Sequence, residues 1–328
     1  MTLDILSDYS RFAQLEGEWE AWGQELPGTT PFQVPQWQLT WWRHFGSGEL
    51  RVMVFREREE MAAIIPCFLH CWNGKRQMTL IGSGISDYLE PLIRPGAADA
   101  VLTALSNYLD ANGEWDVCVW QDLCDASPLI RLEGHRFRVE RFPETECSAI
   151  RLSADFDEYW QARSYDLKRN LRRYRARAET EVKLELAVTD KADETLIDTL
   201  IALHAKRWRK HGQPGMVEAN ASADFLRDAA PRLAGRGMLR LFSLRASSEV
   251  IAVIFAMPRG RSIFAYLTGF SPDWDKFGIG RILLYEALRY SSAQGYERWD
   301  FLRGNENYKS SWGAEKIARS RIVVTRTG

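Results

Sequence analysis

The sequence predicts a mixed α/β protein of two domains, each with a central sheet flanked by helices. Three observations predict this class. Strand-like runs and helical stripes alternate along both halves of the 328 residues. The length suits two domains that each bury a core. The charge divides as well: residues 1–150 carry 12 Lys+Arg and 22 Asp+Glu (net −10), and residues 151–328 carry 31 and 22 (net +9). We therefore predict domains at 1–150 and 151–328.

The first half contains helices and strands in turn. Helices are predicted at 12–26, stopped by Pro27-Gly28, then after Pro35 as far as Trp42, and at 101–109, stopped before Gly113. Apolar and β-branched runs predict strands at 51–56, 61–69, 77–81 and 115–120. The glycine-rich segment 82–88 predicts a loop.

The second half repeats this pattern. Ser164 is expected to cap a helix whose apolar stripe extends to Ala178. Further helices are predicted at 196–208, 223–233 and 278–294. The expected strands lie at 182–188, 238–245, 250–257, 262–270, 298–302 and 317–324.

Composition narrows the class of protein. The five cysteines form no CxxC pair, which favours reduced thiols in the cytoplasm over a disulfide framework or a metal site. No apolar run approaches the roughly 20 residues that span a bilayer. The start, MTLDILSDYS, has no basic and apolar segments of a secretory signal, so we expect none.

Residues 274–281 form the sharpest motif. Gly278 and Gly280 fall between a predicted strand and a predicted helix. Glycines there let an anion approach the free N–H groups at the positive end of the helix dipole. A tight strand–helix turn that needs glycine for its shape alone is the structural alternative.

Two further segments are candidates for ligand contacts. Residues 300–313 are polar and aromatic and follow a strand, so either Arg303 to Trp312 line a cleft or the segment is a surface loop anchored by a buried tryptophan. Residues 163–177 hold seven basic side chains, which predict either a solvated helix face or a site for a phosphate-bearing substrate or RNA. We expect Lys168 and Arg172 to lie closest to the body, and Arg177 to stay in water.

Taken together, these segments resemble the CelD-like acetyltransferases, a family first named from cellulose biosynthesis. Their domain belongs to the GNAT acetyltransferase superfamily and is related to the FemABX aminoacyltransferases. The resemblance extends from about residue 30 to 315 and rests on Pro31-Phe32-Gln33, Trp37, Trp41-Trp42, Ser86-Asp87-Tyr88, Leu167 to Arg173, His204, Arg207-Trp208, Phe277 to Gly280, Asp300 to Gly304, Tyr308-Lys309 and Trp312-Gly313.

The resemblance implies two GNAT-like domains, 1–150 and 151–328, the second carrying an acyl-CoA site and no metal. The donor pyrophosphate would meet Phe277, Gly278, Ile279, Gly280 and Arg281 beside strand 262–270. Asp275 stands where the family has Gln or Arg, and Lys276 and Arg281 are expected to offset its charge.

The same resemblance supplies candidate roles for side chains. Asp87 is the candidate base or acceptor ligand, and Tyr308 the candidate acid, because a phenol carries its proton at neutral pH. The expected substrate-binding residues are Tyr88, Lys168, Arg172, His204, Arg207, Trp208, Arg303, Glu306 and Lys309. For His204, a satisfied core histidine is the structural alternative.

Three functions follow. The first is acyl transfer, most often acetyl transfer, from acyl-CoA to an amine or hydroxyl of a sugar, a cell-envelope precursor or a small metabolite. The second is a FemABX-like transfer from aminoacyl-tRNA, which the basic helix favours and the lack of a helical-arm insertion disfavours. The third is a non-catalytic GNAT scaffold that binds a partner or RNA through residues 163–177.

Overall fold

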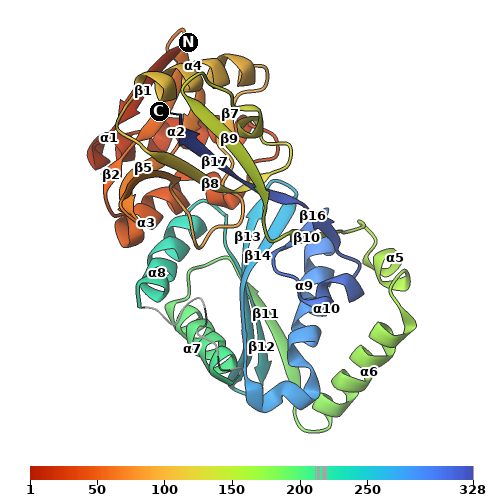
Figure 1. Ribbon diagram of the computed structural model, residues 1–328. Coiled ribbons are helices and arrows are strands. Elements are labelled where there is room, and N and C mark those ends of the chain that lie inside the picture. Colours follow the sequence, from red (N-terminus) through yellow and green to blue (C-terminus); the bar gives the residue numbers. More distant parts are fainter. Residues whose placement is uncertain (211, 213–214, 216–219, 328) are drawn as a thin grey trace. The chain divides into compact units, whose positions relative to one another are not determined.

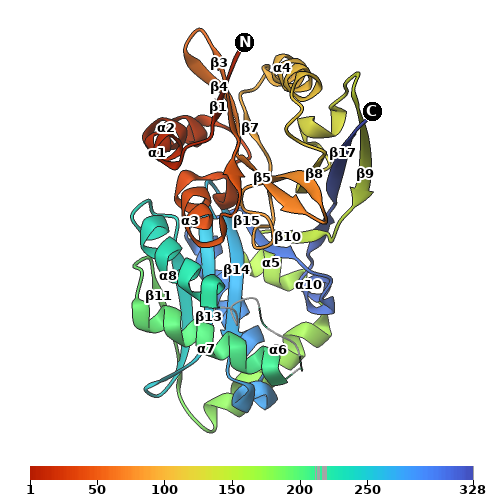
Figure 2. The ribbon, with the colours of Figure 1, turned by 60° about the vertical axis from the view of Figure 1, so that its left-hand side comes forward.

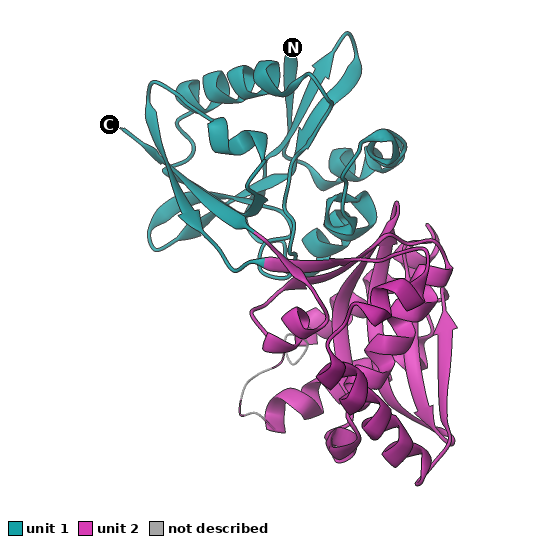
Figure 3. Ribbon diagram, turned by 90° about the vertical axis from the view of Figure 1, so that its right-hand side faces the viewer, with its two compact units in different colours: residues 1–146, 318–328 teal, residues 147–317 magenta. Residues whose placement is uncertain are grey.

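The computed structural model describes residues 1–210, 212, 215 and 220–327, and it divides into two compact units (Figure 3). Unit 1 comprises Met1–Glu146 with Ala318–Gly328, and unit 2 comprises Cys147–Ile317. Both units contain a mixed sheet with helices, which confirms the predicted α/β class.

The units differ from the predicted domains at both ends of the second half. Strand β10 (Cys147–Arg151) pairs with β15 of unit 2, so the division falls before Cys147. The last strand, β17 (Arg319–Arg326), pairs with β8 and β9 of unit 1. Periodicity predicts a strand near the C-terminus but not its partners, because strand pairing is set by contacts distant in sequence.

Unit 1 contains two sheets. The first has the order β1 (Thr2–Leu6), β3 (Val52–Glu57), β4 (Glu60–Ile65), β7 (Leu92–Ile93). The second has the order β2 (Glu49–Leu50), β5 (Cys67–Trp72), β6 (Lys75–Leu80), β8 (Val117–Cys124), β17, β9 (Phe137–Pro143). The single strand predicted at 61–69 is two strands in different sheets. They separate at Pro66, which has no N–H to donate to a ladder.

Unit 1 has helices at each predicted stripe, but the single helix predicted at 12–26 is two helices that meet at Leu15. The helices of unit 1 are α1 (Tyr9–Gln14), α2 (Glu16–Glu25), α3 (Pro35–Phe45) and α4 (Ala98–Ala111), with short 3₁₀ turns η1 (Pro31–Gln33) and η2 (Pro128–Arg131). The core places the apolar face of α4 against side chains from both sheets, among them Phe55, Trp120 and Ile322. None of the helices in the described part of the chain is long and apolar enough to cross a membrane.

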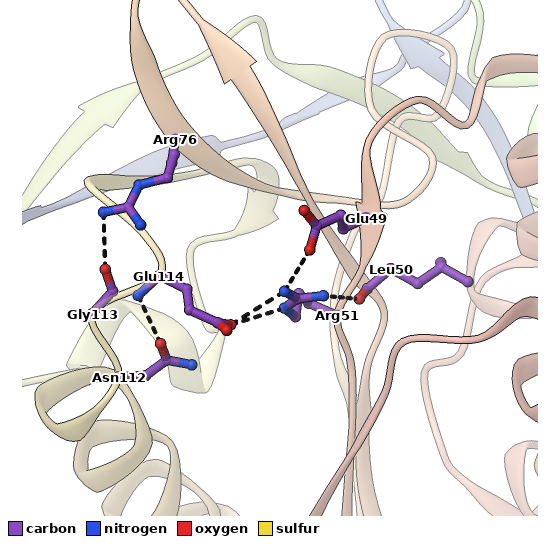
Figure 4. A network of polar contacts seen from close by, with 7 residues as sticks. All are labelled: Glu49, Leu50, Arg51, Arg76, Asn112, Gly113 and Glu114. Atoms are coloured by element: carbon purple, nitrogen blue, oxygen red, sulfur yellow. Dashed lines mark hydrogen bonds and ion pairs between the residues drawn. The ribbon is translucent and has the colours of Figure 1, made fainter.

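A polar network of unit 1 joins β2, the start of β6 and the segment after α4 (Figure 4). Arg51 has a side chain that is only 11% exposed, and its guanidinium donates to the carboxylates of Glu49 and Glu114 at 2.7 and 3.3 Å and to the carbonyl of Leu50 at 2.8 Å. Arg76 donates to the carbonyl of Gly113 at 2.9 Å. The network therefore fixes the segment between α4 and β8 to the start of β3.

We expect Arg51→Met to lower the free energy of unfolding by about 1–2 kcal/mol, because the variant leaves the Leu50 carbonyl and two carboxylates without their donor. Arg11→Met is the matched control: the Arg11–Asp4 pair is more than half exposed on both sides, so its loss should change stability by less than about 0.5 kcal/mol. Urea unfolding measures both. Equal effects of the two substitutions would contradict the role of the network.

Unit 2 is built on one seven-stranded sheet. Its order is β11 (Leu184–Thr189), β12 (Arg240–Ala246), β13 (Glu249–Arg259), β14 (Ser262–Phe270), β15 (Arg298–Arg303), β10, β16 (Glu315–Ile317). Only the β14–β15 pair is parallel. Its helices are α5 (Phe156–Gln161), α6 (Tyr165–Glu179), α7 (Glu194–Lys210), α8 (Asn220–Ala234), the 3₁₀ turn η3 (Pro272–Phe277), α9 (Ile279–Ala293) and α10 (Asn307–Ser311).

The helices cover both faces of this sheet. Figures 1 and 2 show α7 and α8 on one face, and Figure 1 shows α6 and α9 on the other. Helix α7 approaches β14 very closely at Gly269, where a Cβ would lie 2.7 Å from the carbonyl oxygen of Leu200 and 2.9 Å from the nitrogen of His204. Gly269 therefore permits the close contact that brings the polar end of α7 to β14.

Strands β14 and β15 diverge towards their carboxyl ends. Their pairing stops at Phe264 and Asp300, although β14 continues to Phe270 and β15 to Arg303. Strand β14 also has a β-bulge at Tyr266. Consecutive residues Phe255 and Ala256 of β13 pair with Leu267 and Ala265, so Tyr266 has no opposite residue in the register.

Candidate active site

A cavity of about 310 Å³ lies where β14 and β15 diverge. Its wall combines apolar side chains of the strands with polar groups from three helices and the turn before α9. The lining residues are Arg207, Ile254, Ala265, Thr268, Phe270, Asp275, Gly278, Ile279, Gly280, Arg281, Leu284, Trp299, Phe301 and Tyr308. All belong to unit 2, and six of them were predicted from the sequence as site residues.

One end of the cavity is the start of α9. Gly278 has φ 59°, the left-handed conformation, and a Cβ there would lie 2.8 Å from the Tyr174 ring. At Gly280 a Cβ would lie 3.2 Å from the Phe270 ring. No side chain caps α9, so the N–H groups of its first turn face the cavity end without a side-chain acceptor. Both glycines thus have a packing reason, and this helix start also has the polarity that suits an anion.

The charge of Asp275 is compensated from α7, and not by the two residues predicted to do so. The ammonium of Lys210 lies 2.5 Å from the Asp275 carboxylate. Lys276 instead lies over the Phe277 ring at 4.7 Å, and Arg281 donates to the Tyr174 hydroxyl at 3.2 Å. Phe277 itself is buried. The acid that departs from the family pattern is therefore neutralised within the site.

The basic helix contacts the turn before α9 through Arg177. This side chain is exposed, as expected, and it also donates to the carbonyl of Lys276 at 3.5 Å and lies over the Phe277 ring at 5.4 Å. Lys168 donates to the carbonyl of Gln161, the last residue of α5, and Arg172 contacts the Lys168 carbonyl of its own helix. Neither lines the cavity. Their positions next to the apolar stripe of the helix predicted that Lys168 and Arg172 lie close to the rest of the domain. The stripe cannot show which neighbour each side chain contacts.

Tyr308, on α10, provides the hydroxyl group at the wall. Desolvation raises its pKa to about 12 although 37% of the residue is exposed. The negative charge of Glu306 raises this pKa further, and the positive charge of Arg207 lowers it. The phenol therefore carries its proton throughout the neutral range.

Lys309, predicted as a substrate-binding residue, has its ammonium engaged by groups of the chain itself. Its ammonium is buried and donates to the carbonyls of Leu302, Arg303 and Gly304 at 3.2, 2.8 and 3.2 Å. The carboxylate of Glu306 lies 2.9 Å away. All three donors of the ammonium are thus engaged in holding the turn between β15 and α10, the turn that places Tyr308.

Arg163 anchors the other end of α10. Its guanidinium donates to the carbonyl of Trp312 at 2.8 Å, and the hydroxyl of Tyr159 donates to the same oxygen at 2.7 Å. Gly313 is required there, because a Cβ would collide with the Arg163 side chain. The end of β15, the turn that follows it and helix α10 contain Arg303, Glu306 and Lys309, respectively. None of these three residues is among those that line the cavity.

Helix α7 presents Arg207 to the cavity and His204 one turn earlier. The Arg207 guanidinium lies 4.3 Å from the centre of the Phe270 ring, and desolvation lowers its pKa. His204 is buried, and its Nδ1 lies 3.1 Å from the carbonyl oxygen of Thr268. The Trp208 ring packs against this imidazole at 5.9 Å.

Asp87 and Tyr88 belong to unit 1, and both side chains are buried. Asp87 is 5% exposed and Tyr88 2% exposed, with the Arg319 guanidinium over the Tyr88 ring at 4.2 Å. The neighbouring Ser86 accepts a hydrogen bond from the Trp37 indole at 2.8 Å. The glycine-rich loop was expected to extend its carboxylate into a cleft, but its tertiary contacts bury that side chain.

The sequence analysis did not identify the strand residues that line the cavity, or Lys210 as the ion-pair partner of Asp275. Thr268, Phe270, Trp299 and Phe301 line the cavity, yet in sequence they are ordinary strand residues. The signal that could have found them is the position of two predicted strands on either side of the glycine motif. Lys210 could not be found, because its ion pair with Asp275 depends on how α7 packs.

The comparisons with known proteins agree with this geometry. Residues 161–310 match the family model described as "Acetyltransferase (GNAT) domain", and all of them lie in unit 2. The comparison with curated proteins found no match. In the residues that the structure describes there is no group of three or more His, Cys, Asp or Glu side chains that could hold a metal ion.

Solved structures share the fold over nearly the whole chain. The crystal structure of FemX is similar with a TM-score of 0.68 and 10% identity, covering 98% of this chain and 97% of that one. A conserved protein of unknown function from Bacteroides thetaiotaomicron has a TM-score of 0.64, 10% identity and coverage of 99% and 100%. The C-terminal domain of a putative lysylphosphatidylglycerol synthetase from Agrobacterium fabrum has a TM-score of 0.59, 12% identity and coverage of 96% and 92%.

Proposed function

We propose that this chain transfers an acyl group, in the simplest case acetyl, from acyl-CoA to an amine or hydroxyl acceptor. The observation that carries the proposal is the cavity between β14 and β15, which ends at the uncapped start of α9. A diphosphate at that helix start would accept from the backbone N–H groups of Ile279 and Gly280, since the N–H of Gly278 already donates to the Asp275 carbonyl, and the thioester would extend along the splayed strands. The GNAT match of residues 161–310 supports the same donor.

The proposed reaction needs few protein groups. The acceptor's nitrogen or oxygen forms the new bond to the acyl carbon while the carbon–sulfur bond breaks, and Tyr308 gives its proton to the leaving thiolate. Much of the rate would come from holding donor and acceptor in contact. The proposed mechanism assigns no step to Asp87, which belongs to unit 1, whereas the cavity is lined by residues of unit 2.

Acceptor screening tests this function. The protein is incubated with acetyl-CoA and longer acyl-CoAs together with amino sugars, cell-envelope precursors and cell extracts. Mass spectrometry should detect an acylated product in step with release of the CoA thiol. No turnover with any acyl-CoA would contradict the proposal and favour a non-catalytic scaffold.

Transfer from aminoacyl-tRNA is the second candidate, and two observations favour it. The chain shares its fold with FemX, and α6 exposes several arginines next to η3 and α9. A long RNA would contact the whole basic face, so removal of any arginine should weaken binding and salt should weaken it steeply. A CoA phosphate would need only the cations that reach the start of α9.

We expect Arg177→Ala to weaken CoA binding about 3- to 10-fold, because Arg177 contacts Lys276 and Phe277 next to that helix start. Arg169→Ala is the matched control: Arg169 pairs with Asp166 and should have no effect. Lys168→Ala and Arg172→Ala should also change little. Calorimetry with CoA and filter binding with tRNA provide the measurements. Tight tRNA binding that all four substitutions weaken alike would favour the tRNA donor.

A further inference from the structure

His204 is a buried histidine whose second ring nitrogen has no hydrogen-bond partner among the described residues. Its Nδ1 faces the carbonyl oxygen of Thr268 at 3.1 Å. A carbonyl only accepts, so Nδ1 carries the ring proton and Nε2 carries the lone pair. A buried acceptor without a partner is unfavourable and calls for an explanation, of which a catalytic role is one.

The position of this imidazole connects it to the cavity. Thr268 lines the cavity, in the part of β14 that has already lost β15 as its partner. Arg207, three residues further on α7, lines the same cavity. His204 is therefore on the side of α7 that faces the divergence of the strands, and Gly269 allows the close approach that holds it there.

Two neighbours shape the surroundings of Nε2. The Trp208 ring forms an apolar wall. At Gly215 an added Cβ would come within 3.1 Å of Nε2, so only a glycine fits beside this nitrogen without a close contact. Desolvation is the main cause that lowers the pKa of His204. The hydrogen bond with Thr268 raises this pKa, and the positive charge of Arg207 lowers it. The ring is neutral at physiological pH, as a base must be.

We propose that His204 is the general base of the transfer and takes a proton from the acceptor at Nε2. The inference rests on the proposed function and adds the group that activates its nucleophile. As the acceptor's nitrogen or oxygen bonds to the acyl carbon, its proton passes to Nε2 and the thiolate takes a proton from Tyr308. One proton is gained at His204 and one lost at Tyr308, and exchange with solvent restores both residues after product release.

The test uses a variant that keeps the bond to Thr268. In His204→Asn the side-chain amide replaces Nδ1–H as donor to that carbonyl, while nothing replaces Nε2. We expect kcat with acetyl-CoA and the acceptor found by screening, or water in its absence, to fall about 10²- to 10⁴-fold, with the Kd for CoA unchanged. His70→Asn is the control, since His70 lies in unit 1 and contacts Thr79, and it should keep full activity.

The pH profile separates catalysis from packing. In the wild type kcat/KM should fall as the pH drops through a value below 6.5, because the lowered pKa of His204 sets the limb. In His204→Asn this limb should disappear. A kcat near that of the wild type, or an unchanged acidic limb, would overturn the proposal.

A measurement on the unmodified protein covers the case in which the variant does not fold. Long-range ¹H–¹⁵N NMR correlations of the His204 ring should show a neutral imidazole at pH 7 with the proton on Nδ1. A proton on Nε2, or a charged ring, would overturn the proposal. A wild type that turns over no acyl-CoA would instead contradict the proposed function, while the tautomer is still read from the spectrum.

Discussion

Gly280→Val should weaken donor binding strongly while leaving the fold intact. The wild type is expected to bind CoA in the micromolar range, about −8 kcal/mol, with its phosphates at the start of α9. A Cβ at residue 280 would already lie 3.2 Å from the Phe270 ring, and the two further methyl groups of valine would project into the space where a phosphate approaches the backbone. We expect the Kd to rise at least about 30-fold, which corresponds to about 2 kcal/mol.

The series at this position is graded and has a matched control. Gly280→Ala adds only the Cβ, which the Phe270 ring can accommodate by a small shift, so its effect should be intermediate. Gly17→Val makes the same change in a helix of unit 1 where a Cβ meets nothing within 4 Å, and it should leave the CoA affinity unchanged. Calorimetry with CoA measures all three. Undiminished affinity in Gly280→Val would remove the proposed donor site.

The sequence predicts local elements well and their partners poorly. The helical stripes at 167–178 and 278–294 correspond to α6 and α9 because each stripe is the face that packs on the sheet. The short elements β1, α5 and α10 were missed, since a few residues carry too little periodicity. The place of β17 in unit 1 was missed for a different reason: its ladder joins residues nearly 200 positions apart.

The same contrast applies to the site. Gly278, Gly280 and Arg281 could be found because glycines before a helix are a local signal, and they do line the cavity. Lys309 could not be assigned correctly, because the sequence gives no sign that three carbonyls of the preceding turn surround its ammonium. The burial of Asp87 could not be predicted either, because a polar loop residue can be buried by contacts that no local sequence pattern indicates.

Tyr308→Phe should lower kcat about 10²-fold or more without changing CoA affinity. The substitution removes only the hydroxyl. The edge-to-face contact of the ring at position 308 with the Phe301 ring, whose centres lie 5.9 Å apart, is therefore kept. The turn that places the residue is also kept, because Lys309 and Arg163 hold it through backbone carbonyls that the change does not touch. A fall in kcat alone therefore reports the loss of the proton donor.

The pH dependence sharpens this expectation. A group whose pKa is raised to about 12 keeps its proton as the pH rises, so Tyr308 as an acid should cause no loss of kcat between pH 7 and 10. Arg207→Met removes the cation that lowers this pKa, and it should make the phenol a weaker acid and reduce kcat. Tyr165→Phe, on an exposed tyrosine of α6, is the control and should have no effect. Steady-state kinetics with a saturating acceptor measures kcat for the three variants. An unchanged kcat in Tyr308→Phe would show that Tyr308 is only a packing residue at the cavity wall. The proton for the thiolate would then have to come from solvent.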